Sequence, residues 1–246
     1  MQKIIVVAVS FVVLCGGVVL AEDSNWKAGA AKVAITPEEP LWMSGYASRD
    51  KPAEGKLTDL WAKALVLEDG EGQRGLILTL DLVGIDRTLA QAICSGLQQR
   101  HGLSRNQIVI NCSHTHTGPV VGHNLDPLHY LEIDLQQQQA VDRWVETLKQ
   151  KVASVVDNAL DNLAPCSLSW GSGTATFAVN RRENTPESTV PQSRTEATLK
   201  GPVDHDVPVL AARDAGGKLV AVLFGYACHS TVLSSYQWSG DYPGFA

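Results

Sequence analysis

Apolar and polar residues alternate in short runs along the first half of the chain. Three such runs, residues 26–35, 60–68 and 75–83, have the length and composition of β-strands. The turn sequence Asp69-Gly70-Glu71-Gly72 joins the last two and predicts a hairpin. A fourth run, residues 107–110, is rich in β-branched residues and is followed by turn residues, so we predict a buried strand that ends in a loop.

Helical periodicity lies between the third and fourth of these runs. Leu89, Ile93 and Leu97 follow one another at four-residue spacing, which places them on one face of a helix. Asp86 is a candidate N-cap and Gly102 a candidate C-terminal residue for this helix. The resulting order of strand, helix and strand predicts a parallel pair of strands joined by a crossover.

The second half of the chain continues the mixture of helix and strand. An apolar stripe at helical spacing predicts a long helix over about residues 137–163, and residues 167–179 have the pattern of a strand. Residues 184–203 are polar and predict a surface loop or a lid. Residues 207–213 and 218–228 predict a second hairpin with a largely apolar, buried second strand. We therefore expect an α/β fold, with mixed β-sheets and flanking helices in one large domain.

The first 21 residues have the pattern of a secretory signal peptide. Lys3 is followed by the uncharged apolar run 4–20, and Ala21 offers a small residue for cleavage. An uncleaved membrane anchor is the alternative, because the run is close to the minimum length for a span. We expect cleavage, a mature domain over residues 22–246 and a secreted or periplasmic location.

Charge and cysteine usage exclude two classes of function. The 20 basic and 26 acidic residues give a net charge of −6 without a basic stripe, which argues against a nucleic-acid partner. Cys94, Cys112, Cys166 and Cys228 are too widely spaced for a thiolate zinc site. Buried thiols are expected at these positions, with disulfides as the alternative in an exported protein.

Three histidines follow apolar runs and carry the candidate chemistry. His114 and His116 come just after residues 107–110, and an extended backbone would point both side chains to the same side. His229 ends the apolar run 218–228. Zinc hydrolases use about three protein ligands and an open position, and imidazole is their commonest ligand. The alternative is that these are loop histidines without a chemical role.

Other motifs narrow the chemistry. The chain has neither the His-Glu-x-x-His helix of thermolysin-type proteases nor the Gly-x-Ser-x-Gly elbow of α/β-hydrolases. Asp81 and Asp241 are alternative metal ligands, although capping roles are expected for them. We expect His123 and His129 to be plain loop residues, and Asp204-His205-Asp206 to be a solvated turn.

The segment Ser113-His114-Thr115-His116-Thr117-Gly118-Pro119 resembles the Thr-His-Thr-His-Ser-Gly-Pro segment of the neutral (neutral/alkaline, non-lysosomal) ceramidases. The resemblance extends in order over almost the whole chain from Trp26 to Ala246. Weaker matches to the family's motifs occur at residues 29–36, 43–46, 60–68, 180–181, 226–229 and 239–244.

The resemblance implies a zinc-dependent hydrolysis of the amide bond of ceramide, with Zn²⁺ as cofactor, a lipid substrate and a peripheral contact with a membrane surface. It makes His114 and His229 zinc ligands, and His116 a hydrogen-bonding or acid–base group beside the reacting amide. It assigns Arg181 to the polar end of the substrate. The family's further zinc ligands, a glutamate and a tyrosine, and its active-site serine would follow Ala246, so we expect an N-terminal catalytic domain that is incomplete at its C-terminus.

The sequence departs from the family pattern after Gly118-Pro119, and two other functions are compatible with it. Val120-Val121 replaces the double glycine that usually follows Gly-Pro in the family, which leaves the acyl-chain preference open. The same scaffold could act on another N-acyl or ester substrate. A non-catalytic exported domain that binds lipid or carbohydrate is the second alternative.

Overall fold

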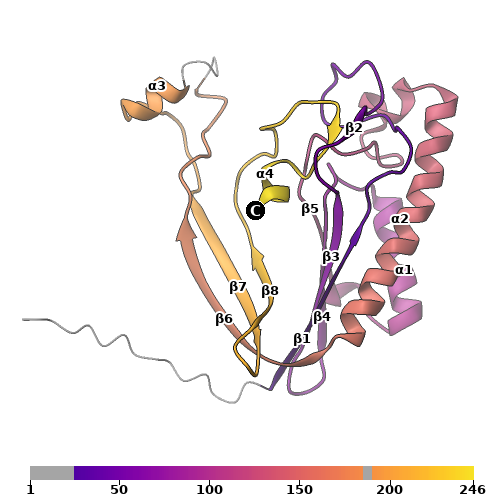
Figure 1. Ribbon diagram of the computed structural model, residues 1–246, viewed down its shortest axis with the longest axis vertical. Coiled ribbons are helices and arrows are strands. Elements are labelled where there is room, and N and C mark those ends of the chain that lie inside the picture. Colours follow the sequence, from indigo (N-terminus) through magenta and orange to yellow (C-terminus); the bar gives the residue numbers. More distant parts are fainter. Residues whose placement is uncertain (1–24, 185–189) are drawn as a thin grey trace, which may run out of the picture.

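The computed structural model describes residues 25–184 and 190–246 (Figure 1). A seven-stranded sheet organises this part of the chain, in the order β5-β4-β3-β1-β6-β7-β8, and a short pair, β2 and β9, lies outside it. The strands are β1 (Trp26–Ala34), β2 (Gly55–Lys56), β3 (Trp61–Glu68), β4 (Arg74–Leu80), β5 (Ile108–Cys112), β6 (Ala164–Thr174), β7 (Asp206–Asp214), β8 (Leu219–Phe224) and β9 (Gln237–Trp238). The helices are α1 (Arg87–His101), α2 (Leu135–Asp161), α3 (Val190–Thr195) and α4 (Asp241–Phe245), with 3₁₀ turns η1 (Arg105–Gln107), η2 (Asp126–Leu128) and η3 (Tyr130–Glu132).

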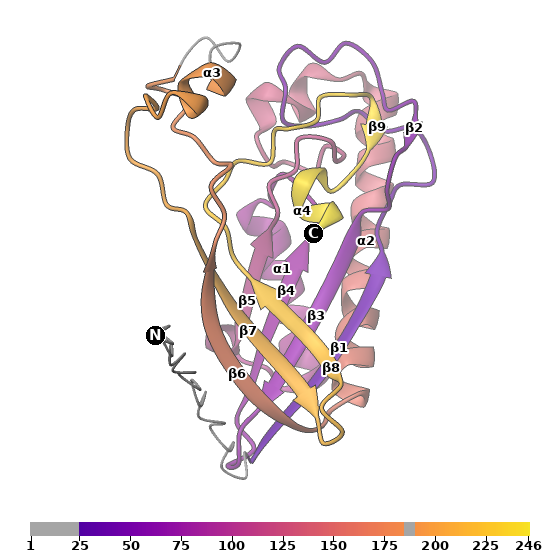
Figure 2. The same cartoon turned by 60° about the vertical axis from the view of Figure 1, so that its left-hand side comes forward.

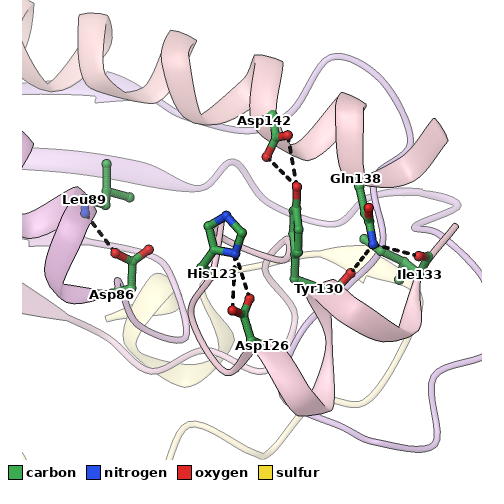
Figure 3. Close-up of polar contacts among 8 residues, drawn as sticks. All are labelled: Asp86, Leu89, His123, Asp126, Tyr130, Ile133, Gln138 and Asp142. Carbon is green, nitrogen blue, oxygen red and sulfur yellow. Dashed lines mark hydrogen bonds and ion pairs between the residues drawn. The ribbon is translucent and has the colours of Figure 1, made fainter. Parts of the chain in front are cut away.

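The predicted crossover is present and sets the polarity of the sheet near the histidines. β4 and β5 are parallel and are joined through α1, whereas β3 and β4 form the predicted antiparallel hairpin. Asp86 caps α1 by accepting a hydrogen bond from the N–H of Leu89 at 2.9 Å (Figure 3), and Gly102 ends it in the left-handed conformation. The expected α/β class, a mixed sheet with flanking helices in a single domain, is therefore confirmed.

The two long helices cover one face of the sheet, and the sheet itself curls (Figures 1 and 2). The stripe predicted for the long helix is the buried face of α2, with Val141, Leu148 and Val152 in the core. Strands β6, β7 and β8 bend away from the helices, so that β8 faces β1 across a cavity of about 340 Å³. The curl brings the end of β8 back toward the ends of β4 and β5.

The two strands that lead to the histidines differ from the prediction. β5 and β8 are the outermost strands of the seven-stranded sheet, not buried ones. Val109 of β5 is 56% exposed, and Phe224 of β8 is 42% exposed. An apolar run does not distinguish a central strand from an edge strand, because the position in the sheet depends on the topology. Burial of these two strands was therefore wrongly predicted.

Two predicted segments in the second half of the chain differ from the structure in their bounds or in their content. The predicted strand 167–179 begins earlier and ends earlier, as β6, and the polar stretch 184–203 contains the short helix α3. No disulfide joins the four cysteines in the described ranges. The predicted signal peptide lies outside the described residues, and within them no helix has the length and apolarity needed to cross a bilayer.

Candidate functional site

His114, His116 and His229 converge at the end of the sheet where β4 and β5 stop. Their metal-ligating atoms all lie within 4.8 Å of one another, and the Nε2 atoms of His114 and His116 are 3.4 Å apart. The ring centroid of His229 is 4.8 Å from that of His114 and 4.7 Å from that of His116. Residues more than a hundred positions apart are thus brought together, as the sequence analysis expected.

The local backbone differs from the extended geometry that we predicted for the His-Thr-His segment. His114 has a φ of 59°, in the left-handed region, so the strand ends before it. Its N–H donates to the carbonyl oxygen of Leu82, and its Nδ1 donates to that of Val83 at 2.6 Å. Because Nδ1 carries the proton of the neutral ring, the Nε2 lone pair of His114 is left to face the other two histidines.

The threonines of the same segment hold its opposite side. Thr115 and Thr117 are fully buried, and both hydroxyls donate to the carbonyl oxygen of Ser239, at 2.8 and 2.9 Å. The N–H of Ser239 donates back to the carbonyl oxygen of Thr117. The hydrogen bonds to Ser239 therefore hold the threonine side of the segment, and the histidines lie on its other side. This role of the threonines was not predicted, although the alternation His-Thr-His-Thr is present in the sequence.

The loop after β8 positions His229 against the first two histidines. Ser230 accepts from the N–H of His116 at 3.3 Å and donates its hydroxyl to the carbonyl oxygen of Ser113 at 2.6 Å. The buried carboxylate of Asp241 accepts hydrogen bonds from backbone N–H groups, including that of Leu233 at 2.7 Å. Asp241 therefore organises the loop.

The two alternative carboxylates do not join the histidines. Asp81 accepts from the N–H of Trp61, and burial raises its pKa. Among the described residues, neither Asp81 nor Asp241 belongs to the group of metal-ligating side chains formed by the three histidines. The turn 204–206 lies at the surface as expected. His129 lies in a loop as predicted, but it is buried, only 4% exposed.

A loop over residues 43–49 supports His116 from a third side. Gly45 has a φ of +99°, and a Cβ there would lie 2.4 Å from Cγ of His116. The Tyr46 ring contacts the His116 ring edge-on, with centroids 4.8 Å apart. Arg49, almost buried, donates from Nη2 to the carbonyl oxygen of His116 at 3.1 Å and from Nη1 to that of Ser235 at 2.8 Å. The support that Gly45 and Arg49 give to His116 was not predicted from the sequence.

The surroundings of His116 and His229 lower the pKa of both rings and so favour their neutral form. Burial, together with the nearby His229, His114 and Arg181, lowers the pKa of His116 to about 4. The pKa of His229 is also lowered, by burial first and then by His114 and Arg181, while Asp241 opposes both shifts. Arg181 lies in an exposed turn, and its positive charge acts on both His116 and His229. Neutral imidazole is the form that binds metal.

We expect the stability of the metal-free protein to fall in acid because of His116. A folded-state pKa of about 4 against about 6.5 in the unfolded chain means that the unfolded state binds more protons between these values. The stability that comes with a neutral His116 is fully present above pH 6.5 and is lost as the pH falls toward 4. Urea unfolding of wild type and His116→Gln between pH 7.5 and 4.5 would show it as a flatter pH dependence in the variant. Equal slopes would contradict it.

The donor set fits a zinc ion. Three imidazoles within one ligand sphere match the nitrogen ligands that zinc prefers. Nδ1 of His116 is buried without a hydrogen-bond partner in the described part of the chain, so this ring is not committed to a structural contact through that atom. His114 and His229 can therefore hold a cation while the His116 ring lies beside it as a polar group.

Comparison with solved structures places the fold among the ceramidases. A structure of a ceramidase complexed with C2 superposes with a TM-score of 0.72 at 23% identity, covering 91% of this chain and 34% of the other. The crystal structure of the neutral ceramidase from Pseudomonas aeruginosa gives 0.71 at 24% identity, covering 91% and 35%.

Sequence comparison identifies the family. The profile for the N-terminal part of neutral/alkaline non-lysosomal ceramidases matches residues 26–246, and the chain belongs to this family. The neutral ceramidase of Pseudomonas aeruginosa is 25% identical over 232 residues, covering 92% of this chain and 33% of the relative. That of Drosophila melanogaster is 26% identical over 231 residues, covering 93% and 31%. The chain thus spans about a third of the length of these relatives.

Proposed function

We propose that this chain is the N-terminal catalytic part of an exported, zinc-dependent amide hydrolase that cleaves N-acylsphingosine into a fatty acid and sphingosine. The observation that carries the proposal is the convergence of His114, His116 and His229 in a chain of the ceramidase family. The substrate is a lipid, so the protein would meet it at a membrane surface.

His114 and His229 would hold the zinc ion. The ring of His114 is oriented for this by the hydrogen bond from its Nδ1 to Val83, which leaves Nε2 as the ligand atom. A bound zinc ion would polarise the scissile carbonyl group and lower the pKa of water. His116 would remain beside the reacting amide.

His116 would handle the proton of the reaction. Hydrolysis adds a hydroxyl group to the acyl carbon, breaks the carbon–nitrogen bond and delivers a proton to the departing nitrogen. His116 is neutral at pH 7, because its pKa is lowered to about 4, and so it can accept a proton from the attacking oxygen nucleophile. The same low pKa makes its protonated form a strong acid, which favours passing that proton to the nitrogen.

Arg181 would bind the polar end of the substrate. Its exposed guanidinium lowers the pKa of both His116 and His229, so its charge acts on the site. We expect Arg181→Ala to raise the KM for ceramide by about 10-fold or more, as for a lost hydrogen bond to a charged group, with a smaller change in kcat. Arg182→Ala removes a neighbouring charge that is also exposed, and it is the matched control. Equal effects of both substitutions would contradict a specific role for Arg181.

The reaction itself can be tested with three substrates. The purified protein, supplied with zinc, is incubated with N-acylsphingosine, an N-acyl amino acid and a fatty-acid ester, and released fatty acid and sphingosine are measured by mass spectrometry. We expect release from N-acylsphingosine. Release from one of the other two substrates alone would replace the proposed substrate. No release from any of the three, together with no stoichiometric zinc, would favour a binding domain.

A further inference from the structure

His129 is buried within hydrogen-bonding distance of the loop that supports His116. It lies between η2 and η3, is only 4% exposed, and its Nε2 accepts a hydrogen bond from the N–H of Gly45 at 3.1 Å. An imidazole that accepts at Nε2 carries its proton at Nδ1, so this contact requires the neutral ring. Burial lowers the pKa of His129, which favours that form.

The segment that carries His129 is fixed to helix α2 (Figure 3). The hydroxyl of Tyr130, the next residue, donates to the carboxylate of Asp142 on α2, with both oxygens at 3.0 Å. The side-chain amide of Gln138, also on α2, donates to the carbonyl oxygens of Tyr130 at 2.9 Å and Ile133 at 3.2 Å. The backbone segment that carries His129 is therefore held against α2.

Gly45 is the point where this attachment meets the site. Before it, the loop is tied to the segment after His116 by backbone bonds, including that from the N–H of Ser44 to the carbonyl oxygen of Gly118 at 3.0 Å. At Gly45 the backbone turns with positive φ and touches the His116 ring so closely that no Cβ fits. Its N–H bonds to His129 and not to the sheet. A shift of Gly45 would therefore move the surface against which His116 rests.

We propose that His129 is a positioning residue for His116: its Nε2 holds the Gly45 N–H, and Gly45 fixes the ring of His116 in the site. Among the described residues, His129 is not one of the converging metal-ligating side chains, and its bond to Gly45 is its link to the site. This inference rests on the proposed function only where catalysis is the measurement. Side chains fixed by such supporting contacts are held closely enough for reaction, and loss of the support typically costs about 10- to 100-fold in activity.

Two variants of similar size separate the acceptor from the volume of the side chain. In His129→Gln the side-chain oxygen reaches the position of Nε2 and can accept from Gly45, whereas in His129→Asn it is too short to do so. We expect kcat for N-acylsphingosine to fall about 10- to 100-fold in His129→Asn, with KM changed less than about threefold, and His129→Gln to stay within about threefold of wild type.

A measurement without substrate keeps the inference independent of the reaction. Ring ¹⁵N–¹H spectra of the metal-free protein report the tautomer and surroundings of His116, assigned with His116→Gln. We expect the His116 signals to shift or broaden in His129→Asn and to remain in place in His129→Gln. Unchanged His116 signals in His129→Asn, equal losses in both variants, or an unfolded His129→Asn by circular dichroism would overturn the positioning role. A wild-type protein that leaves ceramide intact would instead contradict only the proposed function.

Discussion

Replacement of His114 by alanine is expected to abolish zinc binding at the site and, with it, hydrolysis. His114 supplies an Nε2 lone pair whose direction is fixed by the bond from Nδ1 to Val83, and the two other imidazoles lie within the same small sphere. Zinc sites bind with about 10–16 kcal/mol shared among about four ligands, so one ligand contributes about 3 kcal/mol, or about 10²- to 10³-fold in affinity. Metal content after dialysis and calorimetric titration measure this loss.

A histidine outside the cluster provides the control. His101 is the last residue of α1 and pairs with Asp157, so His101→Ala removes an imidazole without touching the three converging rings. We expect this variant to retain one zinc ion per chain and the wild-type affinity. If His114→Ala kept full zinc stoichiometry, or if both variants lost it equally, the assignment of the metal site would be wrong.

Substitution of Gly45 by alanine is expected to have the second-largest effect, because it acts on His116 directly. An added Cβ would lie 2.4 Å from Cγ of His116, and the φ of +99° is already unfavourable for alanine. The loop and the ring must move apart. We expect hydrolysis to fall by about 100-fold, as for a displacement of about 1 Å at a reacting group, with stability reduced by about 1–3 kcal/mol.

Gly72→Ala separates the backbone effect from the contact. Gly72 also has positive φ, +79°, but a Cβ there would meet nothing within 4 Å. We expect this variant to lose stability through its backbone and to keep the wild-type rate. Urea unfolding and steady-state kinetics on both variants distinguish the two effects. A normal rate in Gly45→Ala would show that the close approach to His116 has no catalytic consequence.

Local sequence patterns predicted most of the elements of this fold. The cap at Asp86, the left-handed end at Gly102 and the apolar stripe of α2 each depend on residues a few positions apart, and each is present. The parallel pair β4 and β5 followed from the order of elements alone. The convergence of His114 and His229 was expected because both follow strands and resemble the ceramidase motifs.

What the sequence could not indicate depends on contacts between distant segments. The edge positions of β5 and β8 follow from the order of the strands in the sheet, which no short pattern encodes. Arg49 reaches the backbone of His116 across 67 positions, and Gly45 reaches His129 across 84. The backbone torsion of His114 was also missed, since an isolated His-Thr-His segment is compatible with extended geometry.

The hydrogen bonds of Thr115 and Thr117 to Ser239 bear on the stage of folding at which the histidines come together. They join positions 124 and 122 residues apart, and we expect the loop of His229 to settle after β6, β7 and β8 have paired. Contacts of such separation require a large loss of chain entropy before they form, and they slow folding. The helical layer can therefore assemble early in folding, while competence to bind a cation arises in its last steps.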